Sequence, residues 1–428
     1  MKPISLKEVI DFAWEYSDFY REFWGRRNFI PERDFRVDDD LKKIPILTKE
    51  DLLSVSTKKR SITRSKDHYY FAALSSGTVK DPLVCLQPRF AMPSYYRFVK
   101  DLVQVSDSSV LVLRPGTHAM ALIAGALPEE YFLPGSIIAL GDMDDLTFSA
   151  HLAQEIEMNW LVAKPSDAIR FAPILQQQGY PLSHIKFLHI TGEPLTAATI
   201  SLIKSLYPDA CTVYIYAMTE VPAAMGLKSS LCADLDAVGS NAYHLNTEDF
   251  IFEVVDGLSV ITALHEIPTP LIRYSTGDRI LIKEKFQCSC GFNQDAVVIV
   301  GPRAGETSYK IGGFIFQVDA IKKVLQKLPE FVVGDFQLHI EQIAKDGRLS
   351  NLLRLVVKPV GSPTPFLTST IREILERELY VTRYRLLKWA IQQGLIDPLL
   401  ISYDTDLKGS SIIPPLEIIK PFHNLKKK

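Results

Sequence analysis

An acidic residue beside a glycine is the sharpest chemical feature of this sequence. Residues 274–278 read Tyr-Ser-Thr-Gly-Asp, and a β-like run begins directly after them. A carboxylate held on such a turn, here that of Asp278, can accept hydrogen bonds from two vicinal hydroxyls, as acids do for the ribose of a nucleotide. The alternative is an Asx turn, in which Asp278 bonds only the neighbouring backbone.

Two more acids follow β-like runs. Glu193 comes after the run 187–191 in a Gly-Glu-Pro turn, and Thr219 and Glu220 come shortly after the run 212–216. Ligands of open α/β sheets bind beyond the carboxyl ends of the strands, so these turns are expected to face one crevice. The alternatives are that Glu193 caps the helix that follows it and that Glu220 is a solvated carboxylate.

A stretch rich in hydroxyl groups follows the apolar run 69–73. It reads Leu-Ser-Ser-Gly-Thr-Val-Lys-Asp-Pro over residues 74–82. Backbone N–H groups, hydroxyls and one lysine in such a loop can surround phosphate oxygens. The spacing is not that of a Walker loop, and a Ser/Gly turn between two strands is the alternative.

These three segments, in this order and at these separations, resemble the phenylacetate–CoA ligase branch of the adenylate-forming enzymes. Residues 274–278 closely fit that family's Tyr-Arg-Thr-Gly-Asp signature, and residues 216–220 fit its Tyr-Gly-x-Thr-Glu signature except for Ala217. The resemblance covers most of the chain, from Tyr20-Arg21 and the segment 44–49 to the helix after residue 313.

The resemblance implies a role for the residues of these segments. Tyr216 would pack near the adenine, and Asp278 would grip the ribose hydroxyls. Thr219 would touch a phosphate, Glu220 would hold magnesium, and the Gly-Glu-Pro turn would border the adenine. The implied nucleotide site comprises Ser75, Ser76, Gly77, Thr78, Lys80, Gly192, Glu193, Pro194, Tyr216, Asp278 and Arg303, and the implied catalytic residues are Thr219, Glu220 and Lys420.

The sequence departs from the family at the phosphate loop and at the hinge. The family usually reads Ser-Ser-Gly-Thr-Thr-Gly-Lys-Pro, whereas Val79, Lys80 and Asp81 precede the proline here, so the lysine is shifted by one position. Asp81 would repel a triphosphate unless it points away or coordinates the metal. The hinge of the family shows Gly-Arg followed by acids, and this chain keeps Arg303 and Glu306.

The family's C-terminal domain carries a lysine that reaches the acyl-adenylate, often after a stretch like Gly-Ser-x-Pro. Residues 409–415 read Gly-Ser-Ser-Ile-Ile-Pro-Pro, which makes Lys420 the better candidate and Lys408 the second. Such a lysine would stabilise developing charge rather than act as a nucleophile. A solvated tail lysine is the alternative.

A cysteine pair in the strand-rich part of the chain suggests a metal. Cys288 and Cys290 are close in sequence, and Cys232 and His244 lie upstream. Three thiolates and an imidazole would make a closed tetrahedral zinc site of the structural type. Some members of the resembled branch carry a similar set, with a cysteine ahead of a His-x-x-x-x-Asp stretch that residues 244–249 match. Reduced, partly buried thiols are the alternative.

Short β-like runs alternate with helical ones from about residue 70, which predicts an α/β fold. We expect a large N-terminal adenylation domain of mixed sheets and helices over residues 1–302, with a β-rich subdomain near 241–302. Residues 303–428 are expected to form a small α+β C-terminal domain, and the resemblance implies that this domain is mobile.

Composition limits the partners. The 428 residues include 48 basic and 50 acidic ones, and 47% are hydrophobic. A net charge of −2 offers no basic surface to nucleic acid, and no apolar stretch approaches the ~20 residues that span a bilayer. The odd number of cysteines, five, and the charged N-terminus favour a cytoplasmic protein. A homodimer is expected only from the general prevalence of two-fold assemblies.

The resemblance implies an enzyme that uses ATP and magnesium to convert a carboxylic acid into an acyl-adenylate and then passes the acyl group to coenzyme A. An aryl or arylacetic acid is the family default. Two alternatives stay open: interception of the acyl-adenylate by an amine or a protein thiol in a biosynthetic pathway, and a chain that keeps the nucleotide pocket for binding only.

Overall fold

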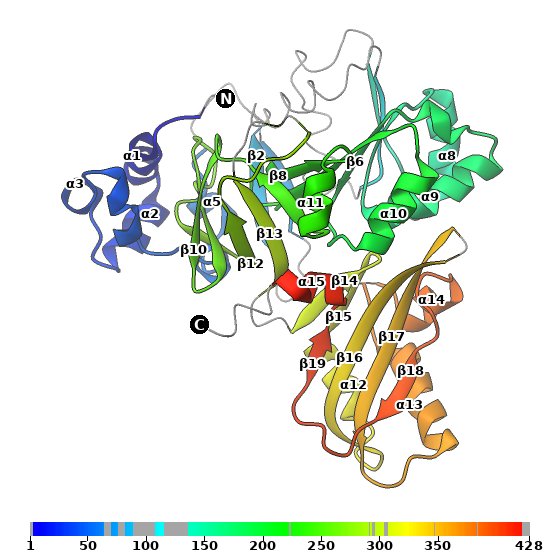
Figure 1. Cartoon of the computed structure of the whole chain (residues 1–428). Coiled ribbons are helices and arrows are strands. Elements are labelled where there is room, and N and C mark those ends of the chain that lie inside the picture. The colour runs from blue at the N-terminus through cyan, green and yellow to red at the C-terminus, as the bar shows by residue number, and fades with distance from the viewer. Residues whose placement is uncertain are drawn as a thin grey trace.

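The computed structural model describes residues 3–63, 70–75, 82–88, 108–114, 136–221, 224–290, 292, 296–303, 307–345, 347–382 and 384–421. Figure 1 shows a larger body that carries the N-terminal helices and a long sheet, and a smaller body with its own sheet below it. No helix within the described ranges is both long and apolar enough to cross a bilayer.

Short, well-capped helices form the N-terminal part. Helix α1 (Leu6–Tyr16) begins with a capping box, because the Ser5 hydroxyl accepts from the Glu8 N–H at 3.3 Å and the Glu8 carboxylate accepts from the Ser5 N–H at 2.7 Å. Ser17 caps α2 in the same way through its hydroxyl. The further elements of this part are α2 (Asp18–Gly25), α3 (Pro31–Asp34), the 3-10 helix η1 (Asp38–Lys43), α4 (Lys49–Leu53) and α5 (Thr57–Arg60).

The larger body is built on an eleven-stranded sheet in the order β10-β11-β12-β13-β9-β8-β7-β6-β5-β3-β4. Neighbours from β7 to β4 pair in parallel, and the remaining neighbours pair antiparallel. The strands are β3 (Ser109–Val112), β4 (Ile137–Leu140), β5 (Trp160–Ala163), β6 (Phe187–Thr191), β7 (Cys211–Ala217), β8 (Ala224–Ser229), β9 (Ala242–Leu245), β10 (Phe250–Val255), β11 (Leu258–Ala263), β12 (Tyr274–Lys283) and β13 (Val297–Arg303).

Helices lie between successive strands from β4 to β7, as parallel pairing requires a crossover. Strands β5, β6 and β7 are fully or largely buried apolar runs, which is typical of a parallel sheet that is covered on both faces. The alternation of strands and helices seen in the sequence is therefore confirmed. The connecting elements are α8 (Leu146–Glu155), α9 (Pro165–Gln177), η3 (Leu182–His184), α10 (Ala197–Leu206) and α11 (Ala233–Val238), and β1 (Tyr70–Leu74) and β2 (Val84–Pro88) form a separate hairpin.

The smaller body contains a four-stranded sheet in the order β18-β17-β16-β19. Its two long central strands pair antiparallel, while both edge strands run parallel to their neighbours. The elements are β14 (Ser308–Ile311), β15 (Phe314–Gln317), α12 (Val318–Leu325), β16 (Val332–Lys345), β17 (Arg348–Pro359), α13 (Pro365–Glu378), α14 (Leu387–Gln392), β18 (Leu400–Tyr403), β19 (Ser411–Ile413) and α15 (Leu416–Ile419).

Each of the two bodies has its own large hydrophobic core. The buried residues of the first core run from Leu6 to Val298 along the chain, and those of the second run from Tyr309 to Ile418. The chain returns to the larger body at its end, where α15 packs against β13 (Figure 1). A domain boundary at residue 302 and mobility of the smaller body stay predictions.

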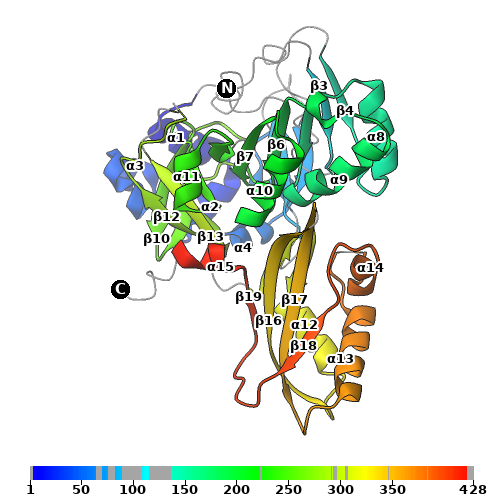
Figure 2. The same cartoon turned by 45° about the vertical axis from the view of Figure 1, so that its right-hand side comes forward.

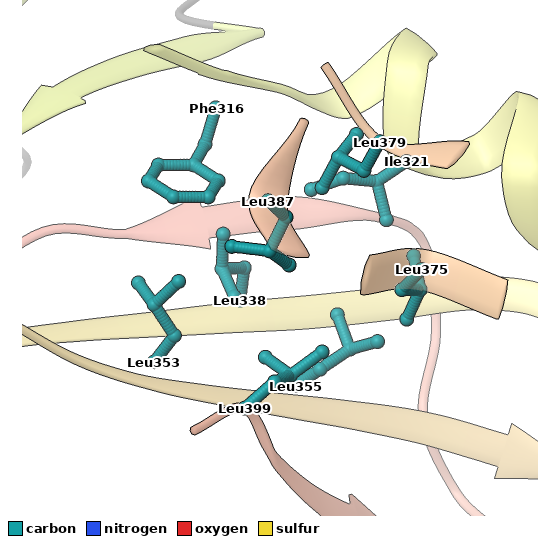
Figure 3. A pocket seen from close by; sticks show the side chains of 9 residues that line it. All are labelled: Phe316, Ile321, Leu338, Leu353, Leu355, Leu375, Leu379, Leu387 and Leu399. Carbon is teal, nitrogen blue, oxygen red and sulfur yellow. The ribbon is translucent and has the colours of Figure 1, made fainter. Parts of the chain in front are cut away.

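The second core contains a cavity of about 10 Å³ (Figure 3). Phe316, Leu338 and Leu355 are among the nine side chains that line it, and all nine are apolar. A space of this size holds at most about one water molecule, and an apolar lining offers that water no hydrogen bond. The cavity is therefore a packing defect of the core and not a ligand site.

Truncation of a side chain beside this cavity tests how strongly the second core stabilises the protein. Leu338 is 2% exposed, so Leu338→Ala is expected to lower the free energy of unfolding by about 2–5 kcal/mol. Leu416 is 69% exposed, and Leu416→Ala is expected to change the free energy of unfolding by no more than about 0.5 kcal/mol. Urea denaturation of both variants measures the difference, and equal shifts would contradict the assignment of this core.

Candidate functional site

The turns that follow β5, β6 and β7 lie at one edge of the sheet. These three strands are parallel neighbours, with Ala163 opposite Ile190 and Thr191 opposite Ile215. Their carboxyl ends therefore point the same way, and the turns carrying Glu193 and Glu220 meet at that edge. The structure thus brings together two of the segments that the sequence singled out.

Tyr216 and Asp278 are joined directly. The Tyr216 hydroxyl donates to Oδ2 of Asp278 at 2.7 Å, and the Asp278 side chain is buried. Tyr216 also stacks on Tyr243 of β9, with ring centroids 6.0 Å apart. Three strands lie between β7 and β12 in the sheet order, a separation of roughly 19 Å in a flat sheet, so the sheet must curl strongly for this bond to form.

The prediction that Asp278 precedes a strand is wrong. It lies inside β12, where the register with β13 shifts between Asp278 and Ile280. Gly277 has φ +79°, and this left-handed residue provides the local kink without ending the strand. The Asp278 N–H donates to Thr276 Oγ1 at 3.1 Å, and its carboxylate accepts from the Tyr216 hydroxyl, a partner distant in sequence.

The Thr219–Glu220 turn is held from two sides. The Tyr274 hydroxyl of β12 donates to Oε1 of Glu220 at 3.3 Å, and the Gln87 side chain of β2 donates to the Thr219 carbonyl. The first residue of the Tyr-Ser-Thr-Gly-Asp segment therefore contacts the last residue of the Tyr-Ala-Met-Thr-Glu segment. Both signature segments form one cluster of hydrogen-bonded side chains.

The start of the hydroxyl-rich loop lies beside a lysine that the motif analysis did not single out. Lys49 Nζ donates to Ser75 Oγ at 3.4 Å, and Ser75 Oγ also accepts from the Leu83 N–H at 2.8 Å. Leu47 holds this segment on β12, since its N–H donates to the Arg273 carbonyl at 2.9 Å and its carbonyl accepts from the Ser275 N–H at 2.8 Å. The remaining predicted loop residues Ser76, Gly77, Thr78 and Lys80 lie outside the described residues.

Glu193 caps a helix, but not the one that follows it. Its carboxylate accepts from the Ser166 hydroxyl at 2.9 Å and from the Ser166 N–H at 3.3 Å, at the N-terminus of α9. Helix α10, which follows Glu193 in the chain, is capped by Thr196 instead. Lys164 Nζ lies 3.8 Å from Oε1 of Glu193 and 3.2 Å from Oδ2 of Asp167. A buried carboxylate at a helix N-terminus is stabilised by the helix dipole as well as by Lys164.

Two further cations surround this turn. Arg114 is 3% exposed and donates to the Thr191 carbonyl at 2.8 Å, and burial lowers its pKa to about 10. Gly192 has φ +91°, and a Cβ there would lie 2.4 Å from Arg114 Nη2, so any other residue would be strained and would have to displace the Arg114 side chain. Lys310 of β14 donates to the Gly192 carbonyl at 2.9 Å. Burial, followed by the charge of Lys164, lowers the pKa of Lys310 to about 8.

Pro194, Arg303 and Lys420 are the remaining predicted site residues. Pro194 is exposed beside Glu193, and the backbone of Arg303 pairs with Asp278 at the end of β13. Lys420 is the exposed C-cap residue of α15 and forms no hydrogen bond or ion pair with any described residue. Its neighbour Pro421 lies near Gly239, and α15 itself packs against β13.

The four predicted metal ligands converge. One ligand atom from each of Cys232, His244, Cys288 and Cys290 lies within 4.8 Å of all the others. His244 Nε2 lies 3.7 Å from Cys232 Sγ and 3.3 Å from Cys290 Sγ. Tetrahedral zinc with sulfur and nitrogen ligands spaces them about 3.5–3.8 Å apart, so these donors fit the ion in type, number and separation. Burial raises the pKa of the Cys232 thiol, so the thiolate form needs a nearby cation.

The known structures that this chain resembles share its fold. One is 2-hydroxyisobutyryl-CoA ligase in complex with 2-HIB-AMP and CoA in the thioesterification state, with a TM-score of 0.64 and 16% identity over 99% of this chain and 90% of that chain. The same ligase in the postadenylation state with R3-HIB-AMP gives a TM-score of 0.59 at 16% identity over 99% and 91%. An open conformation of it with 2-HIB-AMP and CoA gives 0.57 at 17% identity over 95% and 89%.

No protein-family model and no curated protein matches the chain. The structural similarity alone shows that this chain has the fold of AMP-forming acyl-CoA ligases. The expected α/β architecture and the resemblance to the adenylate-forming fold are therefore confirmed. The phenylacetate–CoA ligase-like branch stays a prediction.

Proposed function

We propose that the protein is an AMP-forming acid–thiol ligase, which activates a carboxylic acid with ATP and transfers the acyl group to coenzyme A. The observation that carries the proposal is the joining of both signature segments, through Tyr216 with Asp278 and Tyr274 with Glu220. The fold supports it further, since a ligase of this fold is described with 2-HIB-AMP and CoA bound.

In the first step, an oxygen of the substrate carboxylate attacks the α-phosphorus of ATP. The bond from this phosphorus to its bridging oxygen breaks, and pyrophosphate leaves. The protein's task is to align the reactants and to neutralise charge. In this proposal the Asp278 carboxylate accepts hydrogen bonds from the ribose hydroxyls. Lys49 adds positive charge beside Ser75 at the start of the phosphate loop. Glu220 would hold magnesium, which prefers oxygen ligands and neutralises phosphate charge when bound.

In the second step, the sulfur of coenzyme A attacks the acyl carbonyl carbon. The bond from this carbon to the phosphate oxygen breaks, AMP leaves, and the thiol proton passes to solvent. In this structure Lys310 contacts Gly192 and the β14–β15 turn lies near Glu193, while Pro421, the neighbour of Lys420, lies near Gly239. We propose that this arrangement serves the second step and that Lys420 reaches the site for the first step after the smaller body rotates.

We also propose a structural zinc ion on Cys232, His244, Cys288 and Cys290. The chain supplies these ligands from the turn after β8, from β9 and from the segment before β13. An ion there would tie the segment around residue 290 to the sheet. It would contribute to folding rather than to the reaction, because four protein ligands leave no open position.

The function is tested with purified protein, ATP, magnesium and a panel of acids that includes phenylacetate, benzoate and 2-hydroxyisobutyrate. Pyrophosphate release that needs one of these acids, with trapping of the product by hydroxylamine, is expected because an acyl-adenylate is a reactive acyl donor. Thioester formation on addition of coenzyme A is expected next. Adenylate formation without any thioester would instead favour transfer to an amine or a protein thiol, and no ATP binding at all would reject the proposal.

Removal of the Asp278 carboxylate tests the ribose contact. Asp278→Ala is expected to weaken ATP binding at least tenfold, about 1.4 kcal/mol, and to abolish most discrimination between ATP and its 2′,3′-dideoxy analogue. Asp209→Ala, at an exposed aspartate, is the control and should bind ATP and the dideoxy analogue with the same affinities as the parent protein does. A variant that loses affinity but discriminates like the parent would show that Asp278 only stabilises the kink in β12.

Metal analysis of protein purified without chelator tests the zinc site, with about one zinc per chain expected. Cys288→Ser is expected to lower both the zinc content and the melting temperature, since metal binding is coupled to folding. Cys211→Ser changes a cysteine outside the cluster and should leave the zinc content unchanged. Native protein without metal would settle the question in favour of reduced thiols.

A further inference from the structure

The end of the β16–β17 hairpin of the smaller body docks on the larger body. Figures 1 and 2 show this end directed at α9 and α10; both strands contact α10, and β17 also contacts α9. Gln342 lies in the contact on the strand face that carries Phe336, Leu338 and Ile340 into the second core. The core-facing side of β16 therefore ends in an amide that meets the other body.

The Gln342 amide bonds the first turn of α10. Its Oε1 lies 3.2 Å from both Thr196 Oγ1 and Thr199 Oγ1, and both threonines are buried. The two hydroxyls are 2.9 Å apart, and Thr196 Oγ1 also accepts from the Thr199 N–H at 3.1 Å. Two hydroxyl protons thus serve three oxygen–oxygen contacts. Gln342 Oε1 therefore accepts a hydrogen bond from this pair of hydroxyls.

Asn351 fixes the orientation of this amide. It lies directly opposite Gln342 in the β16–β17 register and is 4% exposed. Its Nδ2 donates to the Leu395 carbonyl at 2.7 Å, so Oδ1 faces Gln342 and accepts from Gln342 Nε2 at 2.8 Å. Because Gln342 must present its NH₂ group to Asn351, its oxygen necessarily points at Thr196 and Thr199.

Asn351 also supports the turn between β14 and β15. Gly312 has φ +56°, and a Cβ there would lie 2.7 Å from Asn351 Nδ2. Gly313, the next residue, has φ +85°, and its Cβ position lies 3.5 Å from Lys164 Nζ and 3.8 Å from Glu193 Oε1. A continuous series of contacts therefore runs from the N-terminal cap of α10 through Gln342 and Asn351 to the β14–β15 turn. This turn faces the candidate site.

We propose that Gln342 is a positioning residue for acyl transfer, which holds the β14–β15 turn and Lys310 against the Gly192–Glu193 turn. This inference rests on the proposed function. Gln342 touches neither the substrate nor the reacting atoms. Its bonds to Thr196 and Thr199 exist only while the hairpin is docked as in this structure, so they favour this arrangement over any other in which Lys420 would approach Glu220 and Asp278.

Gln342→Met tests the inference, because methionine keeps most of the volume and removes both hydrogen-bonding groups. Each lost bond is worth about 0.5–1.5 kcal/mol, so the equilibrium constant for docking should fall about tenfold. Acyl transfer from preformed acyl-adenylate to coenzyme A is expected to slow about tenfold in single turnover, with pyrophosphate release within about twofold of the parent. Gln326→Met, at the exposed C-cap of α12 in the same body, should change neither step.

Thr199→Val provides a second variant that leaves the smaller body intact. It is expected to slow acyl transfer alone, and its combination with Gln342→Met should cost little more than either change, because both remove one contact. Additive effects, equal losses in both steps, or no loss in acyl transfer would overturn the inference. Each of these outcomes would leave the proposed function standing, since the parent would still form the thioester.

Hydrogen exchange tests the positioning role of Gln342 separately from the proposed ligase function, because it does not require the protein to be catalytically active. Gln342→Met is expected to speed amide exchange about tenfold in residues 197–200 and 308–317, and Gln326→Met is expected to leave it unchanged. Faster exchange in a protein whose parent makes no acyl-adenylate would reject the proposed function but keep Gln342 as the residue that positions the turn. Unchanged exchange would overturn the inference whatever the protein catalyses.

Discussion

The curl of the large sheet is the constraint on which the candidate site depends. Strands β7 and β12 are separated by three others in the sheet order, yet the Tyr216 hydroxyl lies 2.7 Å from the Asp278 carboxylate. Only strong curvature through the antiparallel strands brings β12 back to the parallel edge. The same curvature places Tyr274 on Glu220 and, through Leu47, sets Lys49 beside Ser75.

The contact between the two bodies combines several hydrogen bonds with the packing of Leu349 against the first core. Glycines with positive φ, Gly192 and Gly313, let the backbones approach, and Lys310 and Gln342 make the hydrogen bonds. Apolar cores resist rearrangement because they bury large areas, whereas a few exchangeable hydrogen bonds can be replaced by water at small net cost. This difference favours the proposal that the smaller body changes its position as a unit.

Local sequence signals predicted the strands, the signature segments and the metal ligands, because each rests on residues close together in the chain. The fold class, the joining of the Tyr216 and Asp278 segments and the convergence of Cys232 and His244 with the later cysteine pair all agree with the structure. The location of Asp278 inside a strand was missed. A glycine usually signals a turn, but at Gly277 the pairing of β12 with β11 continues on both sides of the kink.

The sequence by itself determined which residue types are present for nucleotide and metal chemistry and in which order they occur, since periodicity and short motifs are local properties. Only the tertiary structure decided that Glu193 caps α9 rather than α10, that Lys49 and Lys310 lie at the candidate site, and that Gln342 faces Thr196. These are single polar residues without a motif. Their roles depend on partners tens to hundreds of residues away, which are brought near by sheet pairing and by docking of the two bodies.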